Sequence, residues 1–103
     1  MVGIKAEISK FVDNSQPGWV ECRFTDVSEE EHTFVEKVPV VTAEYLDENS
    51  TYPQNGFVGC NIIKETNING QRVVEVDTEK PWGIESIKGE CRFTVFPEQL
   101  TEQ

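Results

Sequence analysis

Apolar residues alternate with polar ones along most of the chain, which is the pattern of half-buried β-strands. The pattern is clearest at the start, where Val2, Ile4, Ala6 and Ile8 occupy every second position. Residues 13–18 combine Asp, Asn, Ser, Pro and Gly, all of which favour turns, and the alternation resumes directly after them. The pattern predicts a strand, a reversal of the chain and a second strand.

Two hairpins are predicted in the middle of the chain. Residues 19–27 and 32–41 both alternate and are separated by a short polar break, which is typical of a hairpin. Residues 57–66 and 71–78 form the second pair. A two-residue turn there would place Ile62 opposite a charged side chain, whereas a three-residue loop from Ile68 to Gly70 would place it opposite an apolar one. The three-residue loop is therefore predicted.

A further hairpin is predicted near the carboxyl end, with a two-residue turn at Lys88 and Gly89. The resulting register pairs residues of matching character: Ile84 with Phe93, Trp82 with Val95, and Glu85 with Arg92. Trp82 is accordingly assigned to the core. Proline at position 97 should end the last strand, and the polar tail 97–103 is expected to fray.

These elements predict an all-β fold of about seven antiparallel strands, arranged as a sandwich or a partly open barrel. The stretch 42–56 is the longest irregular region, and at most one short helical turn is expected near 42–47, capped by Thr42. A chain of 103 residues has enough apolar surface for one core, so residues 1–103 are predicted to form a single domain.

Charge narrows the class of partner. Nineteen acidic residues against nine basic ones give a formal net charge of -10, which opposes binding to nucleic acid and to anionic membranes and favours a basic protein partner. The alternative is that the charge only maintains solubility. No apolar run is long enough to span a bilayer and no export signal is visible, so a cytoplasmic location is expected.

The cysteines agree with a reducing compartment. Cys22, Cys60 and Cys91 are odd in number and lie far apart in alternating segments, which favours buried free thiols over a disulfide or a metal site completed by His32. The sequence Glu-Cys-Arg-Phe-Thr occurs at 21–25 and again at 90–94, with Cys and Phe on the predicted inner face each time. This repeat indicates either a duplicated unit or a chance identity between two strands.

No enzyme is predicted, and neither are a metal or a cofactor. Catalysis of the Ser-His-Asp or Cys-His kind needs a histidine, and His32 is the one histidine in the chain, beside three glutamates near a hairpin tip. It is expected there to be a solvated residue at the end of a strand. No glycine-rich phosphate loop or His-x-x-x-His pair is present. The many carboxylates are expected from composition alone.

A binding surface is the remaining hypothesis. Aromatic and acidic residues mixed on loops suit a protein interface, where rings supply anchors and charges accelerate association. The predicted partner-binding residues are Glu29, Glu30, Glu31, Tyr45, Asp47, Glu48 and Tyr52.

The segment Glu79–Ser86, followed by Gly89 and Glu90, resembles stretches of small uncharacterised bacterial proteins. In size, acidity and lack of motifs the chain is similar to immunity proteins that neutralise polymorphic toxins. The resemblance implies an immunity protein that occludes the active site of a basic toxin, for instance a nuclease, and it assigns no functional residue. The alternative is an accessory or housekeeping β-barrel domain that binds another protein.

Overall fold

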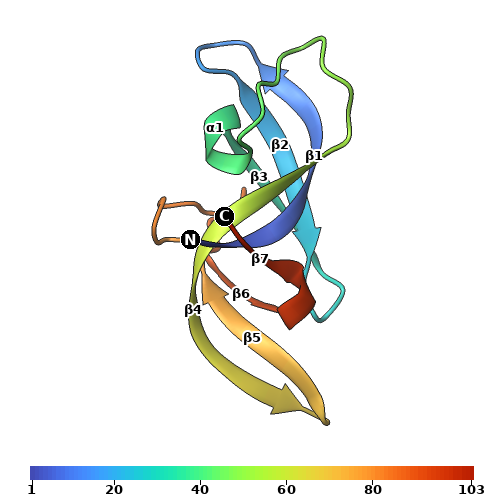
Figure 1. The fold of residues 1–103 in the computed structure, drawn as a ribbon, viewed down its shortest axis with the longest axis vertical. Helices are drawn as coiled ribbons and strands as arrows, with labels where there is room; N and C mark the ends of the chain where they lie inside the picture. Colours follow the sequence, from blue (N-terminus) through green and yellow to red (C-terminus); the bar gives the residue numbers. More distant parts are fainter.

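The computed structural model describes residues 1–103 as seven antiparallel strands in one curled sheet, a half-barrel (Figure 1). The strands are β1 (Val2–Asp13), β2 (Trp19–Thr25), β3 (Glu31–Lys37), β4 (Gln54–Ile68), β5 (Gln71–Asp77), β6 (Arg92–Val95) and β7 (Leu100–Glu102). Their order in the sheet is β3-β2-β1-β4-β5-β6, and β7 pairs with β1. The predicted all-β fold is confirmed, and of the two architectures left open the partly open barrel is the one found.

The curl of the sheet brings β6 back toward β2 and β3, although they lie at opposite ends of the strand order. Two backbone hydrogen bonds cross this gap: Val27 donates to the carbonyl of Thr94 at 3.1 Å, and Ile87 donates to that of Thr33 at 2.9 Å. Between them, the ring of Phe93 contacts aromatic rings of β2 and β3. These contacts close the half-barrel along one side.

The core follows the predicted alternation of the first strands. Seventeen buried hydrophobic residues form one cluster, in which β1 contributes Ile4, Ala6 and Ile8. All three cysteines are free, as expected, but only Cys22 and Cys60 are buried, while Cys91 is half-buried just before β6.

The one helical turn lies slightly earlier in the chain than predicted. It is α1 (Val38–Val41), and Thr42 ends it instead of beginning it, with its N–H donating to the carbonyl of Val38 at 3.2 Å. Pro39 explains the position, because its fixed φ suits the first turn of a helix and needs no hydrogen-bond donor there. No helix of the structure has the length and apolar character needed to cross a membrane.

The hairpin of β4 and β5 has a different turn from the one predicted. Ile68 pairs directly with Gln71, so the loop has two residues, Asn69 (φ 52°) and Gly70 (φ 80°), as in a type I′ turn. Ile62 nevertheless lies opposite an apolar residue, as predicted. A β-bulge between Ile62 and Lys64 shifts the register by one residue, so that Ile62 pairs with Val76.

Replacing Gly70 with valine should destabilise this hairpin through backbone strain alone. Nothing lies within 4 Å of the position that a Cβ atom would take, so no clash contributes. A β-branched residue in the left-handed region should cost about 1 to 3 kcal/mol of the free energy of unfolding. Urea denaturation would measure the loss, and a change within experimental error would show that this turn tolerates other conformations.

The predicted hairpin at Lys88 and Gly89 is not formed. Strand β6 pairs with β5, where Phe93 lies opposite Val76 and Val95 opposite Val74. Its Arg92 contacts the carboxylates of β5, not Glu85. The segment before β6 is a loop that closes in a turn from Ser86 to Gly89, and Trp82 is 57% exposed, so its assignment to the core was wrong.

The carboxyl-terminal tail does not fray as predicted. A short 3-10 helix (Pro97–Gln99) leads into β7, which pairs with residues Val2–Ile4 of β1. The amino group of Met1 also contacts the Glu102 carboxylate at 3.0 Å. The two ends of the chain therefore lie side by side (Figure 1).

Candidate functional site

The predicted partner-binding residues fall into two groups at opposite ends of β2. Glu29 and Glu30 lie in the β2–β3 turn and Glu31 begins β3, whereas the loop 42–53 follows α1 toward the other end of β2 (Figure 1). A strand of seven residues is roughly 23 Å long, so one small contact surface cannot include both groups.

Within the loop 42–53, two of the predicted residues have structural contacts. The hydroxyl of Tyr52 donates to the carbonyl of Asp47 at 2.8 Å, and the Asp47 carboxylate accepts the N–H of Asn49 at 2.8 Å. Tyr45 is 81% exposed and Glu48 is also exposed. The loop therefore presents Tyr45 and Glu48 to solvent, while Asp47 and Tyr52 hold its shape.

The β2–β3 turn is organised by Asp26, a residue that the sequence did not single out as a site residue. One carboxylate oxygen of Asp26, Oδ1, accepts the backbone N–H groups of Ser28 at 2.8 Å and Glu30 at 3.1 Å. Glu29 takes the left-handed conformation (φ 64°) that the tight turn requires. This geometry leaves the side chains of Glu29 and Glu30 exposed at the tip.

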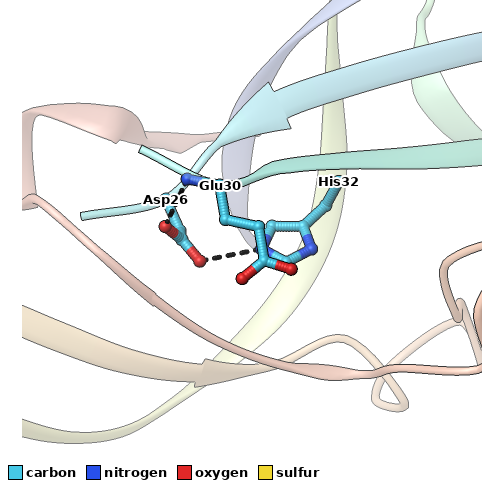
Figure 2. Close-up of side chains that lie close together, drawn as sticks. All are labelled: Asp26, Glu30 and His32. Carbon is cyan, nitrogen blue, oxygen red and sulfur yellow. Dashed lines mark hydrogen bonds and ion pairs between the residues drawn. The ribbon is translucent and has the colours of Figure 1, made fainter. Parts of the chain in front are cut away.

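The other oxygen of Asp26 contacts His32. Figure 2 shows Asp26 Oδ2 facing His32 Nε2, and the two atoms are 2.8 Å apart. His32 is only 6% exposed, because rings of Phe24 and Phe93 pack against it with centroids at 5.5 and 4.6 Å. The sequence predicted a solvated strand-end histidine here, and the structure instead places its ring in the aromatic core with one polar edge turned toward Asp26.

These contacts also set the ionisation of Asp26. Partial burial disfavours the charged carboxylate, but the hydrogen bonds from His32 and from the backbone of Glu30 and Ser28 outweigh that effect. The pKa of Asp26 is therefore below its ordinary value. The contacts therefore favour the charged form of Asp26 at the base of the β2–β3 turn.

A groove with a volume of about 330 Å³ opens beside this pair, between the β2–β3 turn and strands β5 and β6. Its charged and ionisable lining residues are Asp26, Glu30, His32, Glu75, Glu90 and Arg92. Glu75 contacts Arg92 at 3.4 Å and Lys64 at 3.9 Å. Glu30 and Glu90 have no ion pair. The groove therefore carries four carboxylates against one guanidinium.

Two groups of side chains in the fold have metal-ligand chemistry. The ligand atoms of Asp26, Glu30 and His32 lie within 4.8 Å of one another, and so do those of Asp77, Glu79 and Cys91. The first group forms one wall of the acidic groove. The groove can therefore hold a cation, either a positively charged side chain of a partner or a metal ion.

Sequence reasoning found Glu30 but missed the rest of the groove. Glu75 and Glu90 belong to other segments, and they meet the β2–β3 turn only because the sheet curls. The spacing Asp26-x-x-x-Glu30-x-His32 was the one local signal available.

Comparison of the chain with models of protein families, with curated proteins and with solved structures gave no match.

Proposed function

We propose that this protein is a non-enzymatic binding module for a basic protein, with the acidic groove and the adjoining tip of the β2–β3 turn as its contact surface. The observation that carries the proposal is the excess of carboxylates in the groove, two of which, Glu30 and Glu90, lack a cationic partner within the chain. A lysine or arginine side chain of a partner would supply the missing charge.

Long-range charge supports the same surface. A net charge of -10 on a chain of this size attracts a basic partner from a distance, and exposed acids near the contact contribute most at short range. A groove also focuses the field, because its walls have a lower dielectric constant than water.

The most concrete form of this function is an immunity protein that occludes the active site of a basic toxin, for instance a nuclease. A nuclease needs a positive surface to hold phosphate groups, and a carboxylate-lined groove can occupy that surface in place of its substrate. A toxin encoded by a neighbouring gene would be the first partner to test.

Two charge-reversal variants would test the groove. In the first, Glu30→Lys is combined with Glu90→Lys; in the control, Glu44→Lys is combined with Glu48→Lys on the loop 42–53 at the far end of β2. All four side chains are exposed, so both variants should fold, and both change the net charge equally. We expect the groove variant to associate at least about tenfold more slowly with the partner than the control variant does.

The measurement is the association rate with a partner isolated from the native host, at low and at physiological ionic strength. Added salt should slow the wild-type protein strongly and the groove variant weakly. Equal losses in the two variants would assign the effect to overall charge and not to the groove. A salt-independent wild-type rate would refute electrostatic recognition of a basic partner.

The alternative function, an accessory β-barrel domain that binds another protein, has one observation in its favour. The outer half of β4 extends beyond the sheet body and exposes three isoleucines, Ile62, Ile63 and Ile68. An interface on that hairpin would be apolar, so association through it would depend little on salt. The rate measurements above therefore distinguish the two functions.

A further inference from the structure

The acidic groove contains a nitrogen ligand as well as carboxylates. A ring nitrogen of His32 and oxygens of Asp26 and Glu30 lie within 4.8 Å of one another, and Figure 2 shows the three side chains close together, with Asp26 at the Nε2 edge of the imidazole ring. One imidazole and two carboxylates make a donor set that suits zinc and its neighbours in the first transition series, whereas magnesium and calcium prefer oxygen ligands alone.

The imidazole has no other polar contact within the chain. Its ring is more than nine-tenths buried, with the side chains of Phe24 and Phe93 against it, and its one hydrogen bond joins Nε2 to Asp26 Oδ2. The aromatic packing therefore fixes the ring with Nε2 aimed at the carboxylates. A ligand held in this way loses little conformational entropy when it binds an ion.

Asp26 is held in place as well. Its Oδ1 atom accepts two backbone N–H groups of the turn, so that Oδ2 remains for an ion. Such outer contacts orient the ligands in metal sites. The distance of 2.8 Å between Nε2 and Oδ2 needs to widen by about half an ångström for both atoms to bind one tetrahedral zinc ion. The third ligand, Glu30, is exposed and free to adjust.

The groove supplies access and room. All three side chains lie on its wall, and its volume of about 330 Å³ exceeds what an ion and its water molecules occupy. The result is a site with three protein ligands and one open position that faces water. Binding of the ion requires an unprotonated Nε2, so the proton of the neutral ring would lie on Nδ1 in the metal-bound form.

We propose that Asp26, Glu30 and His32 bind one divalent transition-metal ion of the zinc type. This inference does not depend on the proposed function, because it requires no protein partner. It goes beyond what the sequence indicates, since the sequence offers a single histidine and no paired cysteines.

The chain makes a direct test possible because His32 is its only histidine. Protein without an affinity tag is freed of metal with a chelator, and zinc chloride is then added while the imidazole nitrogens are followed by 15N NMR. We expect saturation at one equivalent, a large shift of the Nε2 resonance, and no displacement of zinc by excess magnesium. Calorimetry of the same titration gives the affinity.

Two single substitutions provide the matched comparison. Glu30→Gln removes a ligand at an exposed position, so the fold should persist, and zinc affinity should fall at least about tenfold. Glu29→Gln removes the same charge from the neighbouring residue, which is outside the cluster, and should leave the affinity unchanged. Absence of saturable binding, unmoved nitrogen resonances of His32, or equal losses in both variants would overturn the proposal.

Discussion

Replacement of Phe93 by alanine is expected to lower the free energy of unfolding by about 3 to 5 kcal/mol, a large share of the stability of a domain of this size. Phe93 is 4% exposed and lies on β6. The cost combines lost burial of the ring with the cavity that remains, because neighbouring side chains can fill only part of the space.

The position of this ring in the fold is the reason for expecting the upper part of that range. Phe93 contacts Phe24 at 5.3 Å, His32 at 4.6 Å and Phe34 at 5.7 Å between centroids. These three rings come from β2 and β3, at the opposite end of the strand order. Removing Phe93 therefore weakens the closure of the half-barrel as well as the core.

Chemical denaturation followed by tryptophan fluorescence would measure the effect, with Phe57→Ala as the control. Phe57 is partly buried on β4, so the same deletion should cost clearly less there. Similar losses for the two variants would show that the ring cluster has no special part in closing the sheet.

The sequence predicted the strands well where alternation had one consistent interpretation. Ile4, Ala6 and Ile8 of β1 and Val20, Cys22 and Phe24 of β2 occupy alternate positions and lie in the core, and a shift of one position would turn all of them to solvent. In the repeated Glu-Cys-Arg-Phe-Thr segments both phenylalanines, Phe24 and Phe93, lie in the core and contact each other, whereas Cys22 is buried and Cys91 is only half-buried. Which strands pair across the sheet was not contained in that pattern.

The two later predicted hairpins show why alternation alone does not determine which strands pair. A bulge adds one residue to a strand and has the same effect on pairing as one extra residue in the loop, so parity could not separate the two for Ile62. At β6, Phe93 and Val95 match the apolar residues of β5 as well as they match Ile84 and Trp82. Matching apolar side chains by sequence favoured the nearer segment, which contains Ile84 and Trp82. In the structure, the curl of the sheet places β5 beside β6 instead.

The candidate site was harder to predict for the same reason. Exposed acids on a turn can be found from sequence, and Glu30 was found. The groove needs Glu75 and Glu90 beside it, which depends on the pairing of β5 with β6 and on closure against β2. Burial of His32 likewise depends on rings from two other strands, β2 and β6, so the sequence could only place it near a polar tip.

Stability should fall steeply in alkaline solution because of Cys22. Burial, with smaller contributions from the nearby charges of Glu36 and Glu21, raises the pKa of this thiol to about 12. In the unfolded chain the thiol ionises near its ordinary pKa of 9.0. At pH values between these two thiol pKa values, the folded state therefore keeps a proton that the unfolded state has lost. The free energy of unfolding falls as the pH rises through this interval.

The sign of the pH effect on stability follows from this difference between the folded and unfolded thiol pKa values. The contribution of Cys22 is fully present below pH 9.0 and is lost as the pH rises toward about 12. Each pH unit in this interval should remove up to about 1.4 kcal/mol, so roughly 2 to 3 kcal/mol is lost near pH 11. Cys60 acts in the same direction over a narrower interval, since burial raises its thiol pKa to about 11.

Urea denaturation with reductant, at several pH values from neutral to alkaline, would measure this loss. Other groups titrate in the same range, and the variant Cys22→Ala separates them, because it keeps every other ionisable side chain and removes only this thiol. The variant should be less stable than the wild-type protein at neutral pH, as a small cavity remains. Its disadvantage should then shrink with rising pH, because only the wild-type chain has a Cys22 thiol to ionise on unfolding. Parallel curves for the two proteins would mean that Cys22 ionises equally in the folded and unfolded states, and hence that water reaches it inside the half-barrel.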